Sequence, residues 1–334
     1  RETLGVATTA DNNTAVGFDS LQATTTGPEN TAVGVSSLFS NTTGCRNVAV
    51  GVSSSYTNTA GCENVSMGRQ SLYSNTDGDG HVAVGYNSMF NNTTSDFNTA
   101  VGRQALFTNT TGARNVAIGL NAAYLATTGS CNVVIGQSAN YNATTSSNHT
   151  IVGACAGCRI TTSGNNTIFG YNAQGPQSGD GQNTLLGASA GGSGMTAAAC
   201  NTLIGNSAGA NLTTGTLNIG IGHDAGNCTT SGSCNIGIGY KTNTTSTNSH
   251  NVIIIGMGDG INKFVSGGDN TIKMGKRTAN INNDFSSNAN WSHSSDARYK
   301  KNVQDNTIGL DFINDLRTVT YQWKAQSELD PSLA

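Results

Sequence analysis

The residues with the clearest capacity for chemistry in this 334-residue chain are its eight cysteines. Cys45 and Cys62 occupy the same place in two successive repeats of the sequence, so stacking of the repeats would bring their Cα atoms within disulfide range. Cys228 and Cys234 fall within one loop, which also permits a disulfide. This usage of cysteine favours an oxidising, extracellular setting.

A third pair, Cys155 and Cys158, forms a C-x-x-C sequence. A zinc or redox site is the weaker interpretation, because no second ligand pair with metal-binding spacing follows it. A local disulfide or two free thiols is the better one. We expect no metal and no cofactor.

Paired carboxylates would indicate a polysaccharide-cleaving enzyme, which needs two of them across a groove. Acidic residues in the repeats are isolated apart from Asp77 and Asp79. These two flank Gly78 in a turn, where solvated aspartates are common. No activity on an external substrate is therefore expected.

Charge and hydropathy exclude two classes of partner. Charged residues make up 10% of the chain, its net charge is −3, and ten of its 16 basic residues lie at or after Lys241. The basic residues before that point are too sparse to follow a phosphate backbone, so no nucleic acid is expected. The longest apolar run, Val252 to Ile255, is far too short to enter a membrane as a span.

The elements that carry these residues are set by a glycine that recurs every 17 residues, with one 18-residue step. A fixed short period indicates one small unit stacked many times, a solenoid. We interpret each repeat as strand, turn, strand, turn. Parallel stacking at about 4.8 Å per coil would give a rod about 70 Å long. The glycine series is Gly17, Gly34, Gly51, Gly68, Gly85, Gly102, Gly119, Gly136, Gly153, Gly170, Gly187, Gly205, Gly222, Gly239 and Gly256.

Within one strand, Val48 and Val50 should lie on one face and Ala49 on the other. An apolar residue precedes every glycine of the series, which predicts a core ladder at this position. The small residue opposite would allow close approach by another backbone.

Two further rows repeat with the glycines. We interpret both as packing and hydrogen-bonding ladders in preference to a carbohydrate platform. Aromatic residues lie five positions after the glycine, at Phe39, Tyr56, Tyr73, Phe90, Phe107, Tyr124 and Tyr141. Asparagine lies four positions before it, at Asn13, Asn30, Asn47, Asn64, Asn98, Asn115, Asn132, Asn166, Asn183, Asn201, Asn218 and Asn235.

A single copy of the chain has few large apolar side chains to bury in its interior. About three sizeable apolar side chains per coil supply roughly 2 kcal/mol each, whereas ordering a residue costs about 1–2 kcal/mol. We therefore expect the coils to pack against further copies of the chain, with a homotrimeric fibre as the favoured arrangement.

Phrases such as Asn47–Gly51 and Asn115–Gly119 resemble the repeats of YadA-like trimeric adhesin heads. The resemblance recurs over residues 13–256 and implies a trimeric, left-handed parallel β-roll that binds surfaces.

The 17-residue repeat fades after Gly256. Residues 1–256 form the predicted solenoid, and residues 257–293 are interpreted as a linker or stalk. Residues 294–334 are expected to be a small α+β segment, with an amphipathic helix around Ile308–Leu316 and a strand over Thr318–Lys324.

The phrase Ser295–Asn302, followed by Gly309–Ile313 and Tyr321–Trp323, resembles the start of the endosialidase-type intramolecular chaperone. That domain ends many phage tail spikes and fibres, helps three chains fold together and then cleaves itself off. The resemblance implies Ser295 as nucleophile and Lys300 as its base, with cleavage between Ser294 and Ser295. A desolvated lysine can serve as such a base.

The sequence thus predicts an all-β, homotrimeric fibre made of a parallel β-roll or β-helix with 17-residue coils. Its expected function is attachment of a phage or virus tail to a host surface through a glycan or protein receptor. Its expected location is extracellular, on a virion or a cell surface. A microbial secreted or cell-surface adhesive fibre is the first alternative, and a polysaccharide-degrading tail spike is the second.

Overall fold

The computed structural model describes residues 8–179, 181–192, 194–259, 262–266 and 268–286, and the backbone of residues 292–293. The chain divides into two compact units, Arg1–Ser294 and Ser295–Ala334. The second unit, and with it the predicted α+β segment, lies outside the described residues.

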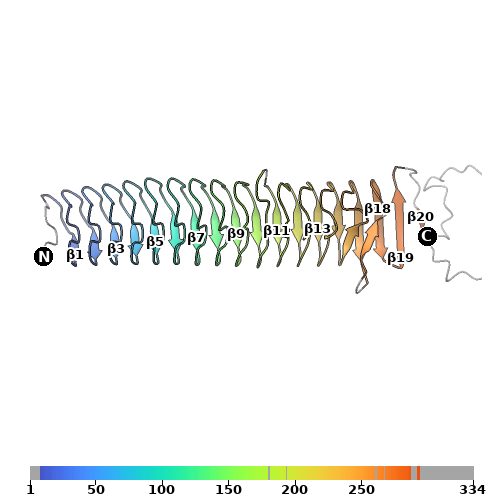
Figure 1. Ribbon diagram of the computed structural model, residues 1–334, viewed down its shortest axis with the longest axis horizontal. Coiled ribbons are helices and arrows are strands. Elements are labelled where there is room, and N and C mark those ends of the chain that lie inside the picture. The colour runs from blue at the N-terminus through green and yellow to red at the C-terminus, as the bar shows by residue number, and fades with distance from the viewer. Residues whose placement is uncertain are drawn as a thin grey trace, which may run out of the picture. The chain divides into compact units, whose positions relative to one another are not determined.

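The first unit is a β-solenoid of about 15 coils, each of about 17 residues (Figure 1). Strands and turns account for the described residues, and no helix occurs among them. The all-β solenoid predicted from the glycine period is therefore confirmed. Its strands are β1 (Thr14–Val16), β2 (Thr31–Val33), β3 (Val48–Val50), β4 (Val65–Met67), β5 (Val82–Val84), β6 (Thr99–Val101), β7 (Val116–Ile118), β8 (Val133–Ile135), β9 (Thr150–Val152), β10 (Thr167–Phe169), β11 (Thr184–Leu186), β12 (Thr202–Ile204), β13 (Ile219–Ile221), β14 (Ile236–Ile238), β15 (Thr242–Thr244), β16 (Ile253–Met257), β17 (Phe264–Ser266), β18 (Thr271–Lys276), β19 (Ala279–Asp284) and β20 (Ser292–His293).

One long parallel sheet runs the length of the solenoid, because each coil adds one short strand beside the strand of the coil before it. β1 to β14 pair in chain order, and β16 and β18 continue the sheet. Equivalent residues are in register, as Val16 with Val33 and Val33 with Val50. The 18-residue step leaves this register intact, with Leu186 opposite Ile204.

The core contains the middle residue of each strand, whereas the residue before the glycine faces outward. Ala32 and Ala49 are fully buried, while Val16 and Met67 are 57% and 45% exposed. The predicted core ladder at the position before the glycine is therefore wrong. Both faces of these strands are apolar, so hydrophobicity alone did not choose between them. The interior takes the middle residue of each strand, which is small at Ala32 and large at Ile151.

Core volume is balanced across many of the coils. In several coils whose strand supplies alanine, the residue four positions after the glycine is large and buried, as at Leu38 and Leu106. Where the strand supplies Ile151 or Leu203, that residue is a glycine. A Cβ on Gly209 would lie 2.6 Å from a methyl carbon of Leu203. Large and small residues thus alternate between the two walls to keep the core filled.

In the coils before Gly239 the wall opposite the sheet is a run of turns and not a second strand, so the predicted order of strand, turn, strand, turn is wrong there. A second strand occurs at this wall only from β15 onward among the described residues. Ser36 and Leu38 have φ angles of 54° and 49°, and equivalent residues repeat this in most coils. The left-handed conformation is unfavourable by about 1–2 kcal/mol for an L-residue. Hydrogen bonds between coils offset this, such as Leu38 N–H to the Ser54 carbonyl at 3.0 Å.

The recurring glycine is required by close approach between coils. Gly102 has a φ of 135°, and a Cβ added there would lie 2.5 Å from the carbonyl oxygen of Gly119. Because every coil repeats this contact with the next one, the glycine has to recur with the coil.

Residues 257–286, within the segment interpreted as a linker or stalk, contain regular structure. β17 pairs with β15 in a small second sheet, and β18 adds a rung to the long sheet. β19 then folds back antiparallel on β18 and pairs with β20. The long sheet therefore ends in an antiparallel edge (Figure 1).

Candidate functional site

The two predicted catalytic residues, Ser295 and Lys300, lie outside the described residues. The dyad and the cleavage point between Ser294 and Ser295 stay predictions. The candidate sites among the described residues lie on the solenoid.

The first is an apolar row on the outward face of the long sheet. We call it the sheet row, and it consists of the residue before each glycine of the series. The sequence analysis found the row and placed it on the wrong face. Its most exposed members are Val16, Met67, Ile118, Phe169, Leu186, Ile238 and Ile255. An apolar row of this length on a monomer indicates an interaction surface.

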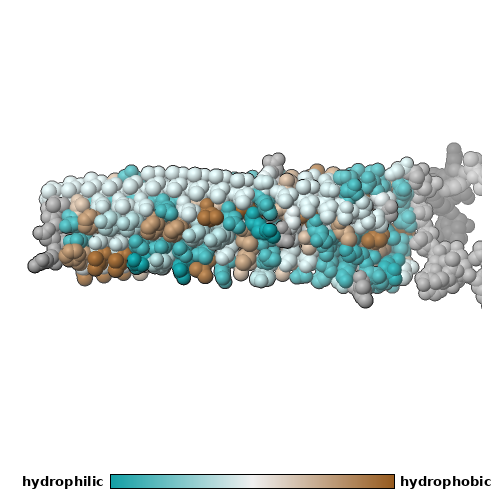
Figure 2. All heavy atoms as spheres, viewed as in Figure 1, coloured by the Kyte–Doolittle hydropathy of each residue, from teal (hydrophilic) through white to brown (hydrophobic). Residues whose placement is uncertain are grey.

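Apolar surface also extends beyond the row near the N-terminal end of the solenoid. Phe18, Val35 and Val52 follow three successive glycines of the series and are 45–53% exposed. Figure 2 shows apolar side chains gathered over these first coils, while the rest of that side is mostly pale or hydrophilic.

The second candidate is the predicted aromatic row. Its seven rings stack in sequence from Phe39 to Tyr141, with centroids 4.9–5.4 Å apart and planes within 16° of parallel. Each internal ring thus has both faces against its neighbours and turns its edge to the surroundings. A sugar platform would need free ring faces, so this geometry favours packing.

The asparagine row is an internal hydrogen-bond ladder, which confirms the structural interpretation. The backbone N–H of Asn47 donates to Oδ1 of Asn30 at 2.9 Å. Its Nδ2 donates to the carbonyl of Gly61 at 2.8 Å. A second amide ladder, which the sequence analysis missed, joins Asn41 to Asn58 and continues through Asn109. Its signal in the sequence was asparagine recurring every 17 residues.

Two histidines replace asparagine in the first ladder. His81 and His149 are buried, and Nδ1 of each accepts the backbone N–H of the next rung, Asn98 and Asn166, at 3.2 Å. Burial lowers the pKa of His81, and it lowers the pKa of His149 to about 4. Both rings therefore serve as uncharged acceptors at neutral pH. Sequence reasoning missed them because it followed only the majority residue.

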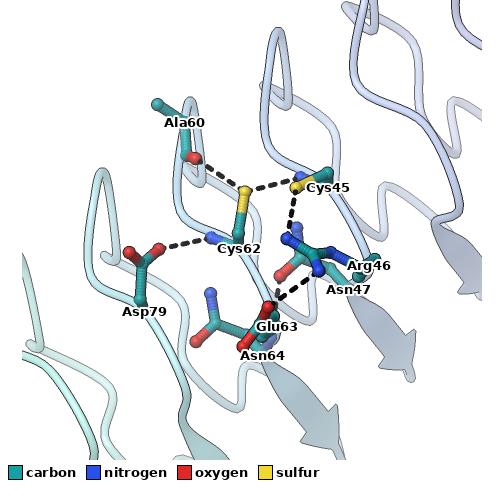
Figure 3. Close-up of polar contacts among 8 residues, drawn as sticks. All are labelled: Cys45, Arg46, Asn47, Ala60, Cys62, Glu63, Asn64 and Asp79. Atoms are coloured by element: carbon teal, nitrogen blue, oxygen red, sulfur yellow. Dashed lines mark hydrogen bonds and ion pairs between the residues drawn. The ribbon is translucent and has the colours of Figure 1, made fainter.

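Cys45 and Cys62 do lie on adjacent rungs, as predicted (Figure 3). The backbone N–H of Cys45 donates to Sγ of Cys62 at 3.1 Å, and that thiol donates to the Ala60 carbonyl at 3.4 Å. Nη2 of Arg46 lies 3.8 Å from Sγ of Cys45. Burial, with the neighbouring Cys45, raises the pKa of Cys62 to about 11.

All eight cysteines are free thiols in the structure, so the three predicted pairings stay predictions. Burial raises the pKa of Cys155, and Gln174 donates to Sγ of Cys158 at 3.3 Å. Nζ of Lys263 lies 2.6 Å from Sγ of Cys228. Cys234 is exposed.

The Asp77 and Asp79 carboxylates take part in turn hydrogen bonds. Oδ1 of Asp79 accepts the backbone N–H of Cys62 at 2.6 Å, and Oδ1 of Asp77 accepts from Thr59 at 3.4 Å. Within the described part of the chain, no group of three or more acidic, histidine or cysteine side chains could hold a metal ion. Nor do the described residues include a helix with the length and apolar character needed to cross a bilayer.

Comparison with protein-family models gives a match at the C-terminal end of the chain. Residues 295–332 match the family model Peptidase_S74, described as chaperone of endosialidase. A search of curated proteins found no match, and neither did a search of solved structures. The chain therefore joins a β-solenoid to a C-terminal segment that matches the chaperone of endosialidase family.

Proposed function

We propose that this chain is a structural and adhesive segment of a homotrimeric phage or virus tail fibre, which attaches the particle to a host surface glycan or protein. The observation that carries the proposal is the chaperone of endosialidase match at residues 295–332, beside a β-solenoid. Proteins of this tail-fibre-like class act outside the cell or on the virion.

The sheet row supports the homotrimer. It offers each copy one continuous outward strip of valine, isoleucine and similar residues, in register over the whole long sheet. Burying such a strip between copies removes apolar surface from water at about 25 cal/mol per Å². Assembly would thus bury apolar surface that a single chain leaves exposed to water.

We further propose that the C-terminal segment cleaves itself off between Ser294 and Ser295. Ser295, the first residue of the family match, would attack the preceding carbonyl, with Lys300 taking its proton. Intact mass spectrometry of the full chain tests this. The wild type should yield a product ending at Ser294, and Ser295→Ala should not.

Lys300→Arg is the matched control, because arginine keeps the charge but stays protonated and cannot act as the base. It should also abolish the product. Only the uncleaved, full-length mass of each of the three proteins would contradict self-cleavage while leaving the attachment proposal open.

Attachment is tested by locating the chain. Gold-labelled antibody against the solenoid should decorate purified virions at their tails, and the isolated trimer should bind host cells and block infection. Labelling of a microbial surface in virus-free cultures would instead favour the secreted or cell-surface adhesive fibre. Release of reducing ends from host polysaccharide would favour a degrading spike.

A further inference from the structure

One turn of the solenoid follows a rule that involves the residue six positions before each glycine of the series, which we call the turn row. In many coils the side chain of this residue accepts the backbone N–H of the turn-row residue in the coil before it. Asp79 accepts from Cys62 at 2.6 Å, and Ser130 accepts from Ala113 at 3.0 Å. Ser147, Ser233 and Asp269 act in the same way.

Cys62 obeys this rule. Its sulfur accepts the backbone N–H of Cys45 at 3.1 Å and its S–H donates to the Ala60 carbonyl at 3.4 Å. Burial raises its pKa to about 11, so this sulfur carries its proton at neutral pH. The Cys62 thiol is thus held by two hydrogen bonds and is protonated at neutral pH.

Cys45 has an acceptor side chain but cannot follow this rule. The turn-row residue before it is Pro28, which has no N–H to give. The sulfur of Cys45 therefore accepts no backbone N–H from the coil before it. It lies 3.8 Å from Nη2 of Arg46, whose Nη1 also pairs with Oε1 of Glu63 at 3.0 Å (Figure 3). Arginine beside a cysteine is a recognised feature of reactive thiols, because a thiolate accepts its N–H more strongly than a thiol does.

We propose that Cys45 is a redox-modification site that reacts with low-molecular-weight disulfides, and that Cys62 then closes a disulfide between the two coils. Residues in register on adjacent rungs lie about 4.8 Å apart, within the Cα range of a disulfide. The inference does not depend on the proposed function.

The chemistry is two thiol–disulfide exchanges. The Cys45 thiolate attacks one sulfur of glutathione disulfide, which forms a mixed disulfide and releases one glutathione thiolate. The Cys62 sulfur then attacks the Cys45 sulfur, releasing the second glutathione, which takes up the Cys62 proton. In sum, two cysteine thiols are oxidised and one glutathione disulfide is reduced to two thiols.

The experiment follows the full chain in glutathione disulfide at neutral pH, with acid quenching and tryptic mapping. Cleavage at Arg46 places the two cysteines on separate peptides, which end at Arg46 and Arg69. We expect glutathione on Cys45 first, at a rate at least about tenfold above that on Cys62. The two peptides should then appear joined by a disulfide while the glutathione is lost.

The chain supplies its own matched controls, because serine already fills the turn row at Ser130 and Ser147. Cys62→Ser keeps the ladder and should leave a persistent mixed disulfide on Cys45. Cys45→Ser should leave Cys62 almost unmodified. Circular dichroism checks that both variants fold.

Two outcomes would overturn the proposal. One is rapid modification of Cys62 in the Cys45→Ser variant. The other is loss of glutathione from Cys45 at the wild-type rate when Cys62 is serine.

Discussion

At the scale of single residues, the buried histidines make the asparagine ladder sensitive to acid. Nδ1 of His149 must keep its lone pair to accept the Asn166 N–H. Protonation would place a second donor against that N–H inside a buried ladder. The folded protein therefore binds this proton less readily than the unfolded chain does.

The pKa of His149 near 4 predicts how stability depends on pH. Its contribution is complete above the unfolded pKa of about 6.5 and is lost as the pH falls toward 4, by about 3 kcal/mol in total. His149→Asn restores the majority residue of the ladder and should remove this loss. Urea unfolding measured between pH 7 and pH 4 checks it.

The second ladder histidine gives an independent check on this experiment. His81→Asn should flatten the acid limb of the stability curve in the same direction as His149→Asn. Equal acid sensitivity in the wild type and the His149→Asn variant would show that the ladder histidine is not responsible.

The glycine contact gives a second prediction at this scale. Gly102→Ala places a Cβ 2.5 Å from a backbone oxygen that cannot move away, at a φ of 135°. It should lower the free energy of unfolding by at least about 3 kcal/mol. Gly226→Ala is the control, because φ there is 66° and nothing lies within 4 Å of the new Cβ. It should lower stability by only about 1 kcal/mol.

At the scale of elements, the stacked aromatic rings from Phe39 to Tyr141 stabilise the packing between successive coils. Tyr73→Ala would leave Tyr56 and Phe90 each without one ring contact. The expected loss of stability is about 2–3 kcal/mol by denaturant unfolding. Tyr73→Phe should be nearly neutral, because phenylalanine already fills this position in other coils. A neutral Tyr73→Ala would mean that the stack contributes little.

The sequence was sufficient to predict the elements that repeat identically. The spacing of Gly102 and Gly119 revealed the coil, and the amide of Asn47 revealed the ladder, because each depends on a contact with its own equivalent in the next coil. The face of Val50 could not be predicted. Both faces of its strand are apolar, and the volume opposite, set by residues such as Leu38 in left-handed conformation, decides which side is enclosed.

The site formed by Cys45 and Cys62 could be predicted only in part from the sequence. The pairing of rungs that places Cys45 beside Cys62 followed from the period. Pro28 has no backbone N–H to donate, and Arg46 lies beside the Cys45 sulfur. These two facts become informative only when the structure shows that side chains in this turn accept backbone N–H groups from the coil before.

At the scale of the whole molecule, the outward sheet row should govern assembly. Ile118→Asp would place a carboxylate in the apolar strip of every copy, which costs several kcal/mol when buried without a partner. Under the proposed homotrimer, we expect trimers from the wild type and monomers from this variant in light-scattering chromatography. Thr128→Asp is the matched control, since Asp77 already stands at that position of its coil, and it should remain trimeric. Trimers from Ile118→Asp would move the interface to another face.

Because each rung of the long sheet pairs only with the rungs on either side of it, coils can be added or removed as whole units. A duplication or deletion of 17 codons would preserve every ladder and change the reach of the rod by about 4.8 Å. Genetic recombination within the repeats can therefore change the length of the rod in equal steps, without any change to the sequence at either end.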